Sequence, residues 1–261
     1  AIIEPPCINT TSMETTIKGQ TIFLGFHIMK DTESQTVSHL LSRRAELGCF
    51  TSIEQVVNEV GFGLEQLKLF IRIGALRSIE TNKKKLLWQA YFLLSGQQKK
   101  KHMYTLFEVN ANRFQLPSLA YDHREDAFDQ MEILGFPMQS PFELLKDQFP
   151  GMVFAEDLAM HNRKHVSMLG YMITVKRTVT TNGKSMFFGT FVDAKGCFID
   201  TVHFPLVAGK YPFRGKGIYL IKGKVVEEFE FFSLEVTAMY RADYINMEDI
   251  DAGASLEEVG A

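Results

Sequence analysis

The residues best suited to binding chemistry form a Gly61-Phe62-Gly63 turn between two segments with helical spacing. Such a turn lets backbone amides at the start of the second helix face outward. These amides and the helix dipole hold a phosphate oxygen without reading bases. Lys68 and Arg72, one helical turn apart, are spaced to reinforce that contact. The alternative is a plain turn between two helices, with glycines present for steric reasons.

A second group of candidates is basic and aromatic and lies in the carboxy-terminal half. Basic loops combined with aromatic side chains that stack on bases are typical of single-strand binding by OB-folds. Because side chains alternate along a strand, Phe187 and Phe191 share one face and Phe188 takes the other, so most of these rings are expected in the core. The candidates for single-strand contact are Lys176, Arg177, Lys184, Phe188 and Lys216.

The remaining reactive residue types do not assemble into an active site. Nucleotidyl transfer needs acids gathered around two metal ions. Asp249 and Asp251 have a suitable spacing, but they lie in an acidic tail without a strand pattern. The seven histidines show no ligand spacing, and the three cysteines form no CxxC pair, which favours free thiols in a reducing cytoplasm. We therefore predict no catalytic residue, no metal and no cofactor in this chain.

Charge is distributed unevenly along the 261 residues, although the net charge is only −3. Residues 16–101 hold 13 Lys/Arg against 7 Asp/Glu, and residues 165–240 hold 9 against 6, whereas residues 241–261 hold six acids and one base. This pattern favours local contact with phosphates over attraction of the whole molecule. No apolar run has the length of a membrane helix, and the amino end lacks a signal pattern, so no membrane partner is expected.

The first half of the sequence has the spacing of short paired helices. After an extended lead-in over residues 1–16, apolar residues repeat at helical intervals over residues 35–44, 52–60, 64–75 and 83–94. Thr51 or Ser52 is expected to cap the second of these helices, with Glu54 in the capping-box position. Residues 102–163 are less regular and are expected to form a connector with partial structure.

After Asn162 the spacing changes from helical to alternating, and five strand-like runs follow. The Asn-Gly pair in the 181–184 turn is the strongest signal for a hairpin, and the 205–212 segment leaves room for a short helix after the third strand. Five strands with a helix in that place match the OB-fold. The predicted fold class is therefore α+β and multidomain, with an all-α module followed by a five-stranded β-barrel.

These segments resemble, in order, the carboxy-terminal part of bacterial DNA polymerase III alpha subunits. FLGFHIMKDTESQTVSHLLSRR resembles the first helix-hairpin-helix element, with Lys30 at the family's lysine and Asp31-Thr32-Glu33 in place of Gly-Val-Gly. CFTSIEQVVNEVGFGLEQLKLFIRIGALRS resembles the second element, MEILGFPMQSPFELLK the connector, and SMFFGTFVDAKG a strand and turn of the OB domain. The resemblance implies duplex-DNA contacts at Lys30, Thr32, Gly61, Phe62, Gly63, Lys68 and Arg72.

The resemblance also implies a domain plan and partners. The family's catalytic palm has no counterpart here, so the chain is expected to hold duplex and single-stranded DNA in a bacterial cytoplasm beside the rest of the polymerase and replisome. Family members carry a peptide that binds the sliding clamp at a position that corresponds here to Met103, Tyr104, Thr105, Leu106 and Phe107. The alternative interpretation is that this segment packs inside the protein. The expected parts are the end of the fingers region (1–16), tandem helix-hairpin-helix module (17–101), connector with clamp peptide (102–163), OB domain (164–240) and acidic tail (241–261).

Two other functions fit the residues alone. One is a stand-alone OB protein for single-stranded DNA or tRNA, in which the helical half would contribute nothing to binding. The other is a small metal-dependent nucleotidyltransferase or nuclease that uses Asp249 and Asp251. Metal-dependent activity of the isolated chain separates the enzyme from both binding functions.

Overall fold

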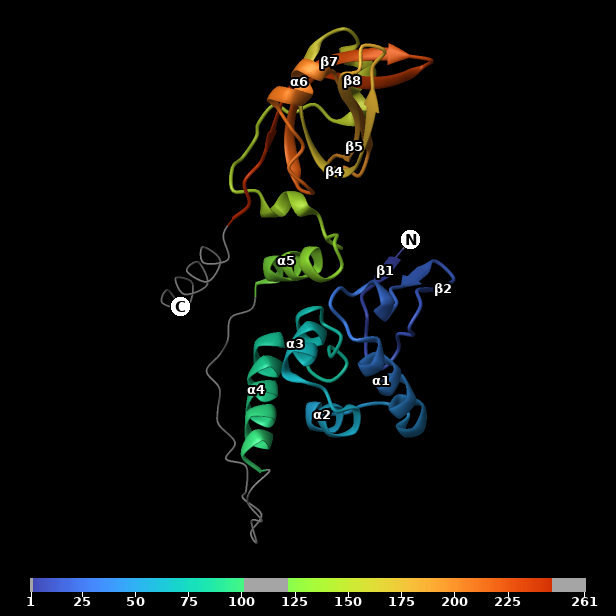
Figure 1. Ribbon diagram of the computed structural model, residues 1–261, viewed down its shortest axis with the longest axis vertical. Coiled ribbons are helices and arrows are strands. Elements are labelled where there is room, and N and C mark those ends of the chain that lie inside the picture. Colours follow the sequence, from blue (N-terminus) through green and yellow to red (C-terminus); the bar gives the residue numbers. More distant parts are fainter. Residues whose placement is uncertain (1, 101–121, 246–261) are drawn as a thin grey trace. The chain divides into compact units, whose positions relative to one another are not determined.

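The computed structural model describes residues 2–100 and 122–245 and divides into two compact units. The first unit extends to Gln139 and the second begins at Ser140. The predicted fold class is confirmed: a helical helix-hairpin-helix region is followed by a closed five-stranded β-barrel (Figure 1). Within the described ranges, no helix combines the length and apolarity needed to cross a membrane.

Helices form most of the first unit and pack around one apolar core. The side chains of Leu67, Phe70 and Ile71 on one face of a single helix are fully buried, as the helical spacing predicts. Phe26 packs on Phe70 with ring centroids 5.4 Å apart. The elements are a 3-10 helix Phe26–Ile28, α1 Ser34–Leu47, α2 Ile53–Val60, α3 Leu64–Arg72, α4 Lys83–Lys100 and α5 His123–Ile133.

The start of α2 shows how a local signal fixes a helix boundary. Ser52 is the N-cap, and its hydroxyl accepts a hydrogen bond from the Gln55 N–H at 3.2 Å. The Gln55 side chain in turn accepts from the Thr51 N–H at 2.9 Å. The reciprocal partner is therefore Gln55 and not Glu54, because the cap is Ser52 and the third helical position falls one residue later.

The first unit also contains a small sheet that the sequence pattern did not predict. β1 Ile2–Glu4 lies parallel to β3 Thr21–Phe23, and β2 Thr16–Lys18 lies antiparallel to β3. Ile8 is fully buried in the helical core, and its N–H bonds to the Ala75 carbonyl. The expected lead-in over residues 1–16 is thus an integral part of this unit. Strands of three residues are too short to produce a readable alternation.

The second unit is a barrel whose strands follow the order β4-β5-β6-β8-β7. All neighbouring strands are antiparallel except β6 and β8, which pair in parallel through Thr201 with Leu234 and Val202 with Glu235. The short helix follows the third strand, as expected for an OB-fold. The bounds are β4 His165–Val179, β5 Ser185–Val192, β6 Phe198–His203, α6 Pro205–Lys210, β7 Ile218–Glu228 and β8 Phe231–Arg241, preceded by 3-10 helices Pro141–Leu144 and Ala155–His161.

The predicted alternation along β5 agrees with its burial. Phe191 is fully buried in the barrel core, whereas Phe188 is 45% exposed on the opposite face. The turn between β4 and β5 contains Gly183 at φ 72°, a left-handed conformation that glycine adopts without steric cost. The Asn-Gly signal therefore located this hairpin correctly.

Candidate nucleic-acid interface

The turn between α2 and α3 has the geometry of a phosphate-binding hairpin. Gly61 ends α2 in a left-handed conformation (φ 73°, ψ 38°), and its N–H bonds to the Val57 carbonyl at 3.0 Å. Gly63 then takes an extended conformation (φ −72°, ψ 156°) as the N-cap of α3. Phe62 points inward, with its ring edge-on to Phe70 at a centroid distance of 4.9 Å. This buried ring anchors the turn and fixes the direction in which α3 begins.

The amino end of α3 is left open by its own fold. Among the described residues no side chain caps it, and the first N–H groups of the helix have no partner there. The two glycines have different roles. Gly61 is needed for its positive φ, whereas a Cβ on Gly63 would meet nothing within 4 Å and its backbone suits any residue. The folded chain therefore does not require glycine at position 63, but a ligand approaching the backbone closely would.

Lys68 lies on α3 one turn beyond these amides. Its ammonium is 2.7 Å from the Glu65 carboxylate and 4.8 Å from the centroid of the Tyr91 ring on α4. The hydrogen bond to Glu65 raises the pKa of Lys68, followed by the contact with Tyr91. Lys68 is therefore a charged group beside the open helix end, held by a carboxylate that a phosphate would have to displace.

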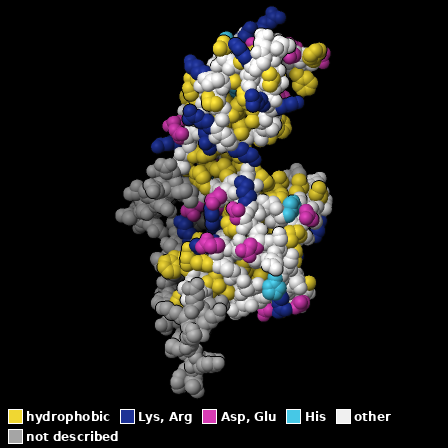
Figure 2. Space-filling model, viewed as in Figure 1, with side chains coloured by type: hydrophobic (Ala, Val, Ile, Leu, Met, Phe, Trp, Pro, Cys, Tyr) yellow, Lys and Arg dark blue, Asp and Glu magenta, His cyan; other side chains and the backbone are white. Residues whose placement is uncertain are grey.

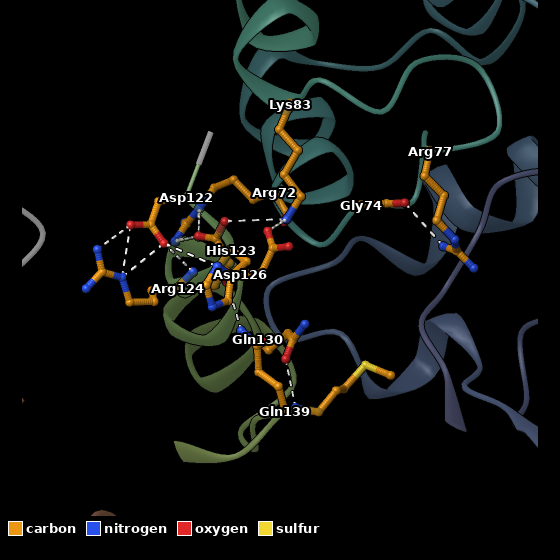
Figure 3. A network of polar contacts seen from close by, with 12 residues as sticks. Arg72, Gly74, Arg77, Lys83, Asp122, His123, Arg124, Asp126, Gln130 and Gln139 are labelled. Atoms are coloured by element: carbon orange, nitrogen blue, oxygen red, sulfur yellow. Dashed lines mark hydrogen bonds and ion pairs between the residues drawn. The ribbon is translucent and has the colours of Figure 1, made fainter. Parts of the chain in front are cut away.

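Arg72, which the sequence placed with Lys68, points elsewhere. Its guanidinium lies 2.7 Å from the Asp129 carboxylate and also pairs with Glu132, both on α5. Lys83 of α4 reaches the same helix, where it pairs with Asp126 (Figure 3). The structure thus gives Arg72 a role in holding α5 and does not bring it to the hairpin amides.

The pKa values of this ion-pair network show how tightly it is enclosed. Burial raises the pKa of Asp129 above its ordinary value, even though Arg72 and Lys83 lie beside it and act in the opposite direction. A hydrogen bond from Arg72 lowers the pKa of the more exposed Glu132. A buried carboxylate keeps its charge only beside a cation, so Asp129 depends on Arg72. This network makes α5, which the sequence placed in the connector, part of the first unit.

The first hairpin keeps the backbone of the second without its glycines. Asp31 adopts φ 57°, the left-handed region that Gly61 occupies in the second hairpin. Glu33 is the N-cap of α1 with an extended backbone (φ −74°, ψ 118°), as Gly63 is for α3. The replacement of Gly-Val-Gly by Asp31-Thr32-Glu33 therefore preserves the turn and places two carboxylates at it.

A side chain from the second hairpin occupies the first. The Gln66 amide accepts from the Glu33 N–H at 3.0 Å and donates to the Asp31 carbonyl at 2.8 Å. The Lys30 N–H bonds to the Ile133 carbonyl at 2.9 Å, and the Thr32 hydroxyl lies 3.5 Å from the Lys30 carbonyl. Gln66 thus occupies the N-cap amide of α1, while the amino end of α1, like that of α3, has no side-chain cap among the described residues. Gln66 was not identified from the sequence, because its partners lie more than thirty positions away.

On the barrel, most single-strand candidates gather on the β4–β5 hairpin. Lys176 pairs in register with the exposed Phe188. Arg177 donates to the Ser185 hydroxyl at 2.8 and 3.1 Å. Figure 2 shows Lys and Arg side chains spread over the drawn face of this unit rather than gathered into one patch. Lys184 lines a pocket of about 330 Å³, together with Ser185, Phe187, Pro205, Ala208 and Gly209.

Lys216 is separate from that hairpin. It lies in the loop before β7, and its carbonyl accepts a hydrogen bond from Arg241 at 3.1 Å. The structure therefore brings Lys176, Arg177 and Phe188 together on one hairpin, with Lys184 at its turn, and leaves Lys216 outside it.

Three candidates lie outside the described residues. These are the clamp peptide Met103–Phe107 and the two acids Asp249 and Asp251. Among residues 2–100 and 122–245, no group of three or more His, Cys, Asp or Glu side chains is gathered as a metal site. All three cysteines fall within these ranges and are free.

Comparison with known proteins agrees with the geometry of the first unit. Residues 1–86 match the family model described as the helix-hairpin-helix motif. No curated protein matches the chain.

Two solved structures give only a distant likeness. The hypothetical protein ygiW of E. coli is 12% identical over 37% of this chain and 99% of its own, with a TM-score of 0.26. RecG bound to a three-way DNA junction is 14% identical over 81% of this chain and 31% of the RecG chain, with a TM-score of 0.25. The chain thus spans about a third of RecG. Its own elements and the motif match define it as a helix-hairpin-helix region followed by an OB-like five-stranded barrel.

Proposed function

We propose that this chain is a non-catalytic DNA-binding segment of a bacterial replicative DNA polymerase alpha subunit. The main support is the amino end of α3, which begins after Gly63 and has no side-chain cap among the described residues. The fold itself does not require glycine at position 63. Helix amides in that position hold a phosphate of duplex DNA without sequence preference. The helix-hairpin-helix match over residues 1–86 and the order of the sequence resemblances support this assignment.

The barrel supplies the second contact in this proposal. Lys176 and Phe188 are neighbours on the outer face of the β4–β5 hairpin, so a base can stack on the ring while the ammonium meets the adjoining phosphate. Arg177 and Lys184 extend the positive charge along the same hairpin. The template strand then follows the barrel while the hairpin of the first unit holds the duplex.

The duplex contact is tested by replacing Gly63 with Asp. The backbone at Gly63 suits an N-cap Asp, and nothing occupies the space around its Cβ. Gly63→Asp should leave the melting temperature unchanged or slightly raised, because the carboxylate caps α3. It should weaken duplex binding tenfold or more, because that carboxylate takes the place of the phosphate. Fluorescence anisotropy with a labelled duplex measures the affinity.

Gln20→Glu is the matched control, since it makes the same charge change of −1 on the exposed β2–β3 turn and should leave affinity within twofold. Affinity of the unchanged chain should also fall steeply with salt as counterions are released. Unchanged duplex affinity in a folded Gly63→Asp chain would refute the hairpin contact. Single-strand binding confined to the barrel would then favour a stand-alone OB protein.

Clamp docking is the third part of the proposal and rests on the sequence resemblance at Met103–Phe107. Leu106 and Phe107 are expected to fill an apolar pocket on the sliding clamp, each contributing about 1.5–3 kcal/mol when buried. Replacing both by Ala should abolish binding to a bacterial clamp in a surface-bound assay and leave DNA affinity and melting temperature unchanged. Met103→Gln should tighten it, because the family pattern has Gln there. A melting temperature lowered by many degrees would instead identify the pair as core residues.

A further inference from the structure

One face of α4 exposes aromatic side chains beside the candidate duplex site. Trp88 is 57% exposed and Tyr91 46%, three positions apart and therefore on the same side of the helix. Leu86 and Ala90 on the opposite side are buried in the core, so α4 is anchored without these rings. Trp88 and Tyr91 line a mostly apolar groove of about 540 Å³. The other described residues in its lining are Lys84 and Leu87.

Packing of α3 against α4 places this groove close to the open amides. Lys83, at the start of α4, donates to the Arg72 carbonyl at the end of α3. Farther along α4, the Tyr91 ring lies under the Lys68 ammonium. The two helices therefore run in opposite directions, and Tyr91 lies beside the middle of α3. Lys68 lies five positions after Gly63, which is about 7.5 Å along a helix.

The chemistry of the groove fits a flat apolar ligand that carries negative charge. Trp and Tyr present ring faces, and the Lys68 ammonium lies over the Tyr91 ring, whereas the Lys84 ammonium pairs with Glu125 of α5 at 2.9 Å. An unpaired nucleotide has both required parts, because its base stacks on an aromatic ring and its phosphate pairs with lysine. A protein partner would be favoured by an apolar groove alone; the lysine stacked on Tyr91 favours a nucleic-acid strand.

We propose that Trp88 and Tyr91 are a stacking platform for unpaired bases of a DNA strand whose adjoining duplex is held at Gly63. This proposal rests on the proposed duplex contact. Together the two sites would make the chain prefer a junction between duplex and single-stranded DNA. A duplex with a single-stranded overhang then binds more tightly than a blunt duplex of the same length. Stacking is tolerant of base identity, so the preference does not depend on overhang sequence.

Trp88 is the only tryptophan of the chain, so its fluorescence reports on this site directly. Titration of the full chain with oligothymidylate should quench the emission as bases stack on the indole. In anisotropy measurements, Trp88→Ala should weaken overhang binding about fivefold or more and leave blunt-duplex affinity unchanged. Tyr91→Ala also removes the ring beneath Lys68, so it should weaken overhang binding more than blunt-duplex binding. Trp88→Phe should retain most of the overhang preference, because an aromatic face remains. Leu206→Ala, which removes an exposed apolar side chain from the second unit, is the control and should change neither affinity.

Failure of the platform and failure of the duplex site give different results. With Gly63→Asp, blunt and overhang affinities should both fall while quenching by oligothymidylate persists. Quenching without any duplex binding would refute the hairpin contact and keep the platform. Absence of quenching would overturn the platform. So would a Trp88 emission of buried-indole type that acrylamide cannot quench, or a large fall in melting temperature for Trp88→Ala, since each shows that the protein itself fills the groove.

Discussion

Replacing Arg72 by Ala should destabilise the first unit by about 2–4 kcal/mol at neutral pH. The guanidinium is the principal cation beside Asp129, whose pKa burial already raises. Without Arg72 the carboxylate stays buried, and among the described residues Lys83, at 3.9 Å, is the one cation left to offset its charge. The helix α5 also loses the contact of Arg72 with Glu132. Urea unfolding of the full chain, followed by far-UV circular dichroism, measures the loss.

The pH dependence of this variant identifies the cause. Removal of Arg72 raises the folded-state pKa of Asp129 further above its unfolded value. The destabilisation is therefore complete above that folded pKa and shrinks as pH falls through it, because a protonated carboxyl needs no cation. Arg72→Ala combined with Asp129→Asn should recover much of the stability at neutral pH. An Arg72→Ala chain with unchanged stability and weakened duplex binding would restore the phosphate contact that the sequence suggested.

Lowering the pH from 6.5 to 4 should destabilise the barrel by about 3 kcal/mol through one buried histidine. The His203 side chain is fully buried, and its Nε2 lies 2.9 Å from the Thr201 hydroxyl. That hydroxyl donates to the Gly189 carbonyl, so Nε2–H is the donor to Thr201. Nδ1 is then unprotonated and has no hydrogen-bond partner among the described residues.

The sign of this effect follows from the lowered pKa. Burial lowers the pKa of His203 from 6.5 to about 4. In the unfolded chain the ring takes up a proton near pH 6.5, whereas the folded barrel excludes it until about pH 4. The unfolded state therefore binds more protons in this window, and stability falls by up to about 1.4 kcal/mol per pH unit as pH decreases.

His203→Gln is the informative variant, because a carboxamide can donate to Thr201 but does not titrate in this range. Carboxylates elsewhere also affect stability at low pH, so the comparison is between slopes for the two chains. The stability of the variant should fall less steeply between pH 6.5 and 4. The difference in slope should correspond to at most one proton taken up on unfolding. Parallel slopes for the two chains would show that His203 already accepts its proton in the folded barrel.

Elements set by local chemistry could be predicted from the sequence. The Asn-Gly turn at 181–184 fixed the first barrel hairpin, and the alternation along β5 sorted its phenylalanines correctly. The Gly61–Gly63 hairpin was recognised because its two glycines mark a helix end and a helix start within three residues. In each case the residues that determine the structure are neighbours in the chain.

The parts that could not be predicted depend on distant partners. Arg72 finds its carboxylates 57 and 60 positions away, and no helical pattern shows that α5 returns to meet α3. Asp31 keeps a left-handed turn where glycine was expected, because the surrounding hairpin determines its backbone. Trp88 and Tyr91 were recognised only as part of a helix, since the side of α4 that packs inward is decided by α2 and α3.

The parallel seam between β6 and β8 determines when the barrel can form. Its partners, Thr201 with Leu234 and Val202 with Glu235, are separated by α6 and the whole of β7, so chain closure opposes their meeting until the intervening elements are in place. The β4–β5 and β7–β8 hairpins can assemble earlier from adjacent residues. During synthesis on a ribosome, the barrel therefore stays open until β8 has emerged. The helices α1–α4 are made earlier, so they can pack together while the rest of the chain is still being synthesised.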